Sequence, residues 1–352
     1  MDSRIKVGIS AGDFNGIGLE IILKTLSDHR ICEMCQPIVY ASKKLIQDSL
    51  KMLEINDINL KYLESTEELK MAKVPLVIEL LNKEDDQPLL EAGKDTSQAG
   101  AFALKSLEAA SGELKKGNID VLVTAPINKR NIQSPSFDFP GHTEFLQALD
   151  QVDQSLMLMV NEQAIIGVVT SHIPLSKVSE ALSSDLILNK ITILNKSLKE
   201  DFGIRKPRIA VLGLNPHAGD RGLIGSEEEE VIFPAIQQAK TIDILAFGPY
   251  PADGFFASAN YKNFDGILAM YHDQGLIPAK ILSAGMGVNF TAGLSFVRTS
   301  PDHGTAYEIA GKGIADAASF SNAIYRAVEI TNRRKQNQQL VEEAMEKNKS
   351  RN

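Results

Sequence analysis

Cysteine, basic charge and long apolar runs are all scarce in this 352-residue chain. Its two cysteines, Cys32 and Cys35, form a C-x-x-C pair, but no second pair completes a zinc site. We therefore interpret them as packed thiols of a reducing compartment. The formal net charge of −8 argues against a nucleic-acid-binding protein, because such proteins normally present a basic face.

Membrane and export signals are missing as well. No apolar run approaches the roughly 18–20 residues that a membrane span requires. No signal-peptide core precedes the first predicted strand, Ile5–Ser10. These absences predict a cytoplasmic protein with no membrane partner. The remaining composition is that of an ordinary globular protein, long enough for two domains or one large domain.

The usual dinucleotide-binding fingerprint is also absent. Three glycines lie in the segment 12–18, between the first predicted strand and a helical pattern, but their spacing does not fit G-x-G-x-x-G. No acidic residue ends the next predicted strand, Pro37–Tyr40. We therefore exclude an ordinary Rossmann cofactor site. A tight strand-to-helix turn, in which Asp13 caps or binds locally, is the simpler interpretation.

Apolar runs alternate with helical patterns along the chain, which predicts an α/β fold. Three predicted strands run into histidines: Ile165–Thr170 before His172, Arg208–Leu214 before His217 and Gly266–Met270 before His272. In open parallel sheets, ligands bind beyond the carboxyl ends of the strands. Three of only six histidines in such places are hard to explain as core packing.

Three imidazoles would form an open coordination shell, with positions left for substrate or water. The sequence therefore predicts a divalent-metal site made of His172, His217 and His272, although sequence separation does not prove that they converge. A hydrogen-bonded pair of His272 and Asp273 is the simpler alternative for that stretch. Imidazoles accept zinc, cobalt or nickel, whereas magnesium prefers oxygen ligands.

Other segments suit an anionic ligand. Gly141–Glu144 is predicted to open a helix, where His142 or Thr143 would face an anion, with a plain N-cap as the alternative. Lys280 and Arg298 supply cations suited to phosphate or carboxylate.

Three local predictions concern turns and helix ends. A turn at Gln274–Gly275 is predicted to follow the third histidine. The acidic run Glu227–Glu230 is predicted to begin a helix, whose dipole favours carboxylates there, with a solvated face as the default alternative. A long helix is predicted over Ile314–Asn332, and the polar tail from Arg333 is predicted to fray.

Together these stretches resemble one family closely, the 4-hydroxythreonine-4-phosphate dehydrogenases of pyridoxal phosphate biosynthesis. The matching segments span almost the whole chain in order: Gly12–Glu20, Gly141–Glu144, Val169–Leu175, Asn215–Gly219, Pro251–Asp253, Tyr271–Lys280 and Val288–Ala306. The resemblance implies a two-domain α/β fold of the isocitrate/isopropylmalate dehydrogenase type, with the active site in the cleft between domains. Residues 1–140 and 291–352 would form the first domain, and 141–290 the second, carrying the metal ligands and a dimer interface.

The resemblance also implies roles for individual residues. One divalent ion per site (zinc, cobalt or magnesium) would be held by His172, His217 and His272, the last contributed by the partner subunit of a homodimer. Catalytic roles fall to Asp273 and Lys280. Substrate contacts would come from His142, Thr143, Asp253, Lys280, Asn289 and Arg298. NAD, or NADP, would be bound by Thr291, Gly293, Leu294, Asp302 and Gly304.

The implied reaction is NAD-dependent, metal-assisted oxidation of 4-phosphohydroxy-L-threonine to a 2-amino-3-keto acid, which decarboxylates to 3-amino-2-oxopropyl phosphate. The alternatives are a paralogous dehydrogenase of threonate or erythronate 4-phosphate and a catalytically silent binding protein of the same fold. The chain departs from the family pattern twice. Its first loop reads G-D-F-N-G-I-G-L-E instead of G-D-P-A-G-I-G-P-E, and Gly254 stands where threonine is common. Both departures concern fine substrate preference.

Overall fold

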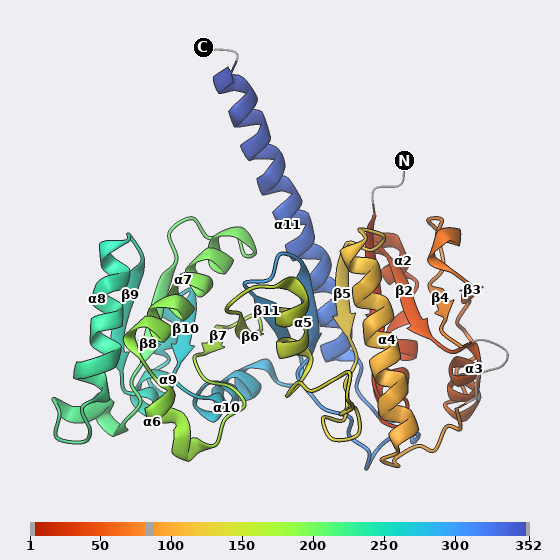
Figure 1. Ribbon diagram of the computed structural model, residues 1–352, viewed down its shortest axis with the longest axis horizontal. Helices are drawn as coiled ribbons and strands as arrows, with labels where there is room; N and C mark the ends of the chain where they lie inside the picture. Colours follow the sequence, from red (N-terminus) through yellow and green to blue (C-terminus); the bar gives the residue numbers. More distant parts are fainter. Residues whose placement is uncertain (1–3, 82–87, 350–352) are drawn as a thin grey trace. The chain divides into compact units, whose positions relative to one another are not determined.

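The computed structural model describes residues 4–81 and 88–349, and its contacts divide the chain into two compact units (Figure 1). Unit 1 comprises residues up to Phe145 together with Phe296–Thr331. Unit 2 comprises Leu146–Ser295 together with the residues from Asn332 onward. The division predicted from sequence places all of 291–352 in the first domain, whereas residues from Asn332 onward group with unit 2.

The described strands of unit 1 form a parallel arrangement. Their order is β3 (Lys61–Leu63), β4 (Leu76–Glu79), β2 (Cys35–Ala41), β1 (Ile5–Ser10), β5 (Val121–Thr124) and β12 (Val297–Pro301). The helices include α1 (Gly18–Leu26), α2 (Arg30–Met34), α3 (Lys43–Met52) and α4 (Ser97–Lys115). Strand β2 is buried along its whole length, and apart from Gln36 its residues are apolar rather than alternating.

The segment that follows β1 is a buried polar turn. Asp13 is fully buried, and its Oδ1 accepts a hydrogen bond from the Asn15 backbone N–H at 3.0 Å. Its Oδ2 accepts a second bond from the Tyr307 hydroxyl at 2.6 Å. A Cβ on Gly12, whose φ is +66°, would lie 2.3 Å from the Pro126 carbonyl oxygen, so only glycine fits there. The predicted local role of Asp13 is therefore confirmed.

The described strands of unit 2 form a mixed sheet. Their order is β11 (Val288–Ala292), β6 (Leu156–Val160), β7 (Ile165–Val168), β10 (Gly266–Ala269), β8 (Arg208–Leu212) and β9 (Leu245–Tyr250). The last four are parallel, and β6 is antiparallel to both of its neighbours. The helices include α6 (Val178–Ala181), α7 (Ser184–Glu200), α8 (Phe233–Thr241), α9 (Ala252–Ala257) and α10 (His272–Ser283). The chain thus inserts β10 between two strands that precede it in sequence.

The strands predicted before the three histidines are confirmed, each one or two residues shorter than expected. The hydrogen-bond ladder between β7 and β10 nevertheless continues past their ends. The backbone N–H groups of Val169 and Thr170 donate to the carbonyls of Ala269 and Met270, at 2.8 and 3.2 Å. The segments leading to His172 and His272 therefore leave the sheet as paired backbone.

The predicted turn at Gln274–Gly275 is wrong, because α10 runs through it. A Cβ on Gly275 would lie 2.7 Å from Cγ1 of Val168 and 3.1 Å from Cβ of Ala269. The glycine is therefore required for close packing of the helix against β7 and β10. Gln274 reinforces this packing, since its side-chain amide donates to the Gly213 carbonyl at 2.6 Å.

The prediction of a fraying tail is also wrong. Helix α11 spans Ala318–Lys349 and extends well past Asn332 (Figure 1). Lysine, glutamate and glutamine have high helix propensity, so a polar composition does not by itself end a helix. Contacts also anchor it within unit 2, because the Arg334 guanidinium donates to the buried Asp201 carboxylate at 2.6 Å.

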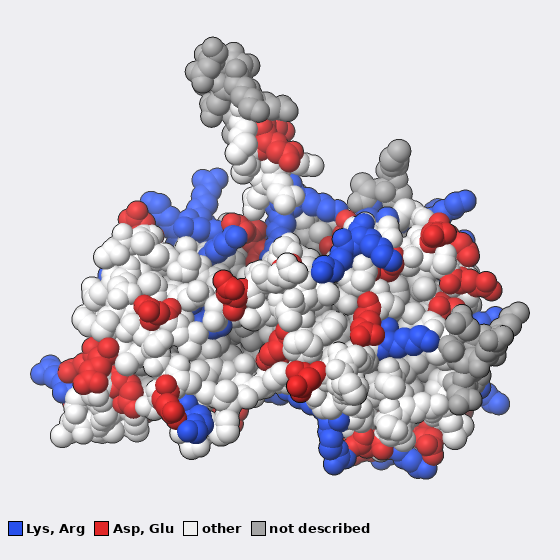
Figure 2. Space-filling view, in the orientation of Figure 1, with Lys and Arg blue, Asp and Glu red and all other residues white. Residues whose placement is uncertain are grey.

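The described helices show no feature of a membrane span, and the face drawn in Figure 2 shows no broad field of one charge. Across residues 4–81 and 88–349, no helix combines the length and the apolar character needed to cross a membrane. On the face drawn in Figure 2, basic and acidic side chains are interspersed, with neither sign gathered into a broad field.

Candidate functional site

The three predicted metal ligands follow three adjacent parallel strands. In unit 2 the order β7, β10, β8 places the segments leading to His172, His272 and His217 at the same edge of the sheet. Ligand crevices of parallel sheets lie at this carboxyl edge. The strand order therefore places the three histidine-bearing segments next to one another, which the sequence alone could not establish.

His172 and His272 lie close together within one chain. Their ring centroids are 6.1 Å apart and the rings are tilted by 43°. Nδ1 of His272 is 2.6 Å from Oδ1 of Asp273, so the simpler pairing considered from sequence is present. A carboxylate on Nδ1 favours the tautomer whose Nε2 lone pair is available to an ion, as in carboxylate–histidine–metal arrangements.

His217 is exposed on a turn with unusual backbone geometry, η3 (Pro216–Asp220). Its φ is +56°, and Ala218, Asp220 and Arg221 also have positive φ values. Left-handed conformations of non-glycine residues cost on the order of 1–3 kcal/mol each and persist only where the surroundings impose them. Such residues cluster at functional sites, so this geometry favours a role for the turn.

The donor chemistry of these histidines fits a divalent ion, but one chain does not assemble a full shell. Among the described residues, no group of three or more histidine, cysteine, aspartate or glutamate side chains is placed to hold a metal. Exposed imidazoles suit zinc, cobalt or nickel. An ion at this edge would therefore need ligands beyond those that one chain brings together.

The other predicted residues of unit 2 are distributed over neighbouring elements. Lys280 lies on α10 and Asp253 in the first turn of α9, and both are exposed. Asn289 is half-buried on β11, and its Oδ1 is a buried acceptor with no hydrogen-bond donor among the described residues. Thr291, on the same strand, is fully buried.

Two predicted substrate contacts come together in unit 1. Arg298 lies on β12, is 2% exposed and donates to Oγ1 of Thr124 at 2.6 Å. His142 is the first residue of α5 (His142–Asp150), as predicted, and Thr143 follows it, half-buried. Burial, with the positive charges of Arg298 and Lys129, holds the pKa of His142 well below its usual value.

The charge of this pair therefore comes from Arg298. Burial lowers the pKa of Arg298 to about 10, against the opposing effect of Glu144, so the guanidinium remains protonated at neutral pH. The His142 imidazole is neutral under the same conditions. A buried guanidinium beside a neutral imidazole is suited to bind a phosphate or carboxylate group.

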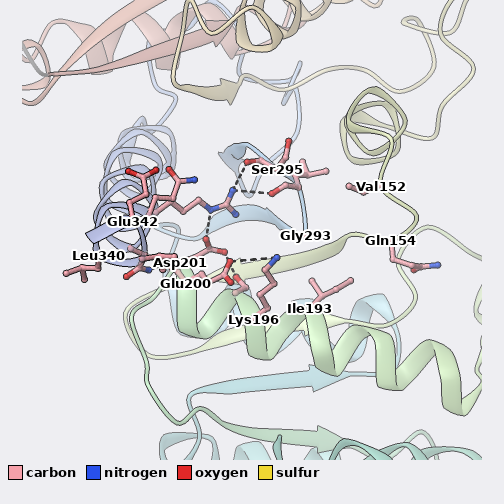
Figure 3. Close-up of a pocket in the computed structure, with 16 residues that line it drawn as sticks. Val152, Gln154, Ile193, Lys196, Glu200, Asp201, Gly293, Ser295, Leu340 and Glu342 are labelled. Carbon is pink, nitrogen blue, oxygen red and sulfur yellow. Dashed lines mark hydrogen bonds and ion pairs between the residues drawn. The ribbon is translucent and has the colours of Figure 1, made fainter. Parts of the chain in front are cut away.

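Strand β12 separates the residues predicted to bind NAD into two groups. Asp302 and Gly304 follow β12, whereas Gly293 and Leu294 precede it. Because β12 has five residues, its two ends, next to which these groups lie, are roughly 16 Å apart. In unit 2, Gly293 and Leu294 instead border a pocket of about 1030 Å³ between α7 and α11 (Figure 3). Its other lining residues include Val152, Gln154, Ile193, Lys196, Glu200, Leu340 and Glu342.

The acidic run Glu227–Glu230 begins a helix, as predicted, but the alternative of a solvated face is wrong for Glu228. Glu228 belongs to a π-helical turn, η4 (Glu228–Ile232), that precedes α8, and it is only 3% exposed. The solvated interpretation holds for its neighbours Glu229 and Glu230, which are exposed. Glu228 instead accepts hydrogen bonds from the segment that leads to His217.

Comparison with known proteins places the chain in a family. The family model of the pyridoxal phosphate biosynthetic protein PdxA matches residues 33–327. The chain belongs to this family. A 4-hydroxythreonine-4-phosphate dehydrogenase from Bacteroides thetaiotaomicron is 48% identical over 330 residues, covering 94% of this chain and 89% of the relative.

Two further relatives bear on the fold and on the choice of substrate. The crystal structure of 4-hydroxythreonine-4-phosphate dehydrogenase from Klebsiella pneumoniae matches with a TM-score of 0.81 at 34% identity, covering 94% of this chain and 98% of that one. This match confirms the predicted isocitrate/isopropylmalate dehydrogenase-like fold. A putative D-threonate 4-phosphate dehydrogenase from Oceanobacillus iheyensis is 37% identical over 334 residues, covering 94% of this chain and 99% of the relative.

Proposed function

We propose that this protein is an NAD-dependent, divalent-metal-assisted dehydrogenase of pyridoxal phosphate biosynthesis. It oxidises 4-phosphohydroxy-L-threonine to a 2-amino-3-keto acid, which loses carbon dioxide to give 3-amino-2-oxopropyl phosphate. The observation that carries the proposal is the adjacency of the three histidine-bearing strand ends in a PdxA-family chain. The 48% identity to a relative named for this activity supports the same substrate.

In this proposal His172, His217 and His272 hold the ion, and His272 reaches the site of the partner subunit in a homodimer. A bound divalent ion supplies Lewis acidity, which lowers the pKa of a coordinated hydroxyl group. Asp273 orients the His272 imidazole through Nδ1. Asp273 in the first turn of α10 and Lys280 in its last turn are both exposed, and they are the groups available to move protons.

The remaining residues bind and orient the reactants. Arg298 offsets the phosphate charge beside His142, and Thr143 follows His142 at the start of α5. Asn289 offers its unsatisfied Oδ1 to a donor such as the substrate ammonium group, and Asp253 lines the site from α9. Thr291, Gly293, Leu294, Asp302 and Gly304 are the proposed contacts for NAD or NADP. The proposed location is the cytoplasm.

Comparing substrates tests the activity directly. The purified protein, supplied with NAD and a divalent ion, is expected to form NADH with the highest kcat/KM on 4-phosphohydroxy-L-threonine. A preference for D-threonate or erythronate 4-phosphate would establish the second candidate, which the similarity to the Oceanobacillus relative supports. Stoichiometric ion binding without turnover of any of these substrates would indicate a silent binding protein.

Replacing Arg298 tests the phosphate contact. Arg298→Ala is expected to raise KM for the phosphorylated substrate roughly 10- to 150-fold, because a hydrogen bond to a charged group contributes about 1.5–3 kcal/mol. The unphosphorylated analogue should be affected much less. Since Arg298 is buried, Arg298→Lys serves as a second variant that keeps the charge, and circular dichroism checks both folds. An equal penalty on both substrates would remove Arg298 from this role.

A further inference from the structure

The buried carboxylate of Glu228 lies against the turn that carries His217. Its Oε1 accepts hydrogen bonds from the backbone N–H groups of Leu214 and Asn215, both at 2.7 Å. Its Oε2 accepts a third bond, from the Asn215 side-chain amide, at 3.0 Å. These donors lie just past the end of β8, where no strand in the described part of the chain pairs with them. Glu228 therefore satisfies backbone groups that the sheet no longer can.

The carboxylate also lies close to both ends of the segment Gly213–Gly219. A Cβ on Gly213 would lie 3.0 Å from Oε1 of Glu228, and a Cβ on Gly219 would lie 2.6 Å from Oε2. Neither position has room for a side chain while the carboxylate stays in place. The segment Gly213–Gly219 is thus folded closely around Glu228, with His217 near its far end.

The neighbouring acidic side chains show that this placement is specific. Glu227 contributes a second, less buried clamp, because it accepts the Asn215 amide and the Ser179 hydroxyl, each at 2.7 Å. Glu229 and Glu230 are exposed. The π-helical turn η4 starts at Glu228, and such turns occur frequently at functional sites. Two of the four carboxylates therefore bond to the segment that leads to His217, and of these only Glu228 accepts from its backbone N–H groups.

We propose that Glu228 is a positioning residue for the metal site, acting through His217. Its charge-assisted hydrogen bonds hold the left-handed backbone of the His217 turn and so orient the imidazole before an ion arrives. Without them the turn would have to become ordered during binding, and that ordering would weaken affinity. The inference rests on the proposed function only in taking His217 as a ligand.

Titration of the full-length apoprotein with Co²⁺ tests this role. In Glu228→Gln, an amide NH₂ replaces one acceptor oxygen and faces donors. We expect the Kd for Co²⁺ to rise about 10- to 100-fold, the range seen when supporting partners of metal ligands are lost. Saturating Co²⁺ should restore kcat close to that of the wild type, because the ligands themselves remain. Glu229→Gln and Glu230→Gln are matched controls and should bind as the wild type does.

A second pair of variants addresses the case in which Glu228→Gln fails to fold. Gly219→Ala would place its Cβ against Oε2 of Glu228, whereas Gly222→Ala, at a similar φ of +83°, meets no atom closer than 3.6 Å. Both carry left-handed strain, but only Gly219→Ala should weaken Co²⁺ binding. Wild-type affinity in Glu228→Gln, or equal losses in the two glycine variants, would overturn the inference. Failure of the wild type to bind Co²⁺ would overturn the proposed function and this inference together.

Discussion

His217→Ala protein is expected to show no measurable turnover while keeping its fold. The side chain is exposed, so its removal opens no cavity, and the neighbouring Ala218 already adopts the same left-handed conformation at φ +52°. The two remaining imidazoles would hold the ion too weakly to polarise the substrate hydroxyl. Loss of about 4 kcal/mol of transition-state stabilisation corresponds to roughly a thousandfold lower rate.

The measurements are NADH formation with added divalent ion, the metal content of the purified protein and its thermal unfolding. His29→Ala is the matched control, because His29 is also exposed but is not one of the predicted site residues. It should retain metal and activity. Full activity in a metal-free His217→Ala preparation would rule out the metal proposal.

The second large effect is the recovery of activity when two inactive variants are mixed. If His272 serves the partner subunit's site, a dimer of one His172→Ala chain and one His272→Ala chain has both lesions in one site and none in the other. Random reassociation makes about half of all dimers mixed, so about one quarter of wild-type activity should return in a closed two-fold dimer. Each parent homodimer has two damaged sites and should stay inactive.

All three pairwise mixtures are needed, because His172 and His272 of the same chain lie close enough to serve one ion together. With His272 crossing, mixtures of its variant with either other variant recover, and the His172–His217 mixture does not. If His217 crosses instead, the His172–His272 mixture stays inactive and the other two recover. No recovery in any mixture, with mixed dimers demonstrated by mass spectrometry, would place all three ligands in one chain.

Periodicity and strand-end reasoning identified the three histidines and most of the strands that carry them. They could not supply the order of β7, β10 and β8, because sequence separation contains no information on which strands pair. The turn predicted at Gln274–Gly275 failed for a related reason. Glycine often marks a turn in a sequence, but in α10 it permits close contact with Val168, which is distant in the chain.

Glu228 was missed because its surroundings are invisible to pattern analysis. An acidic run reads as a helix start or a solvated face, and nothing local separates Glu228 from Glu229. The distinction arises from Leu214 and Asn215, whose N–H groups need an acceptor once β8 has ended. That these two N–H groups lack a strand partner becomes clear only when the path of the left-handed turn that follows them is known.

The insertion of β10 between β7 and β8 also has a consequence for biosynthesis. A nascent chain that ends before Gly266 contains His172 and His217, yet the strand that separates and pairs with both of theirs has not been made. If these histidines bind an ion as proposed, metal acquisition is expected to follow completion of the second unit rather than to guide its early folding. A chaperone or metal donor acting on the unfinished chain would meet histidines that are not yet held together. Metal binding would then occur only after β10 has been synthesised.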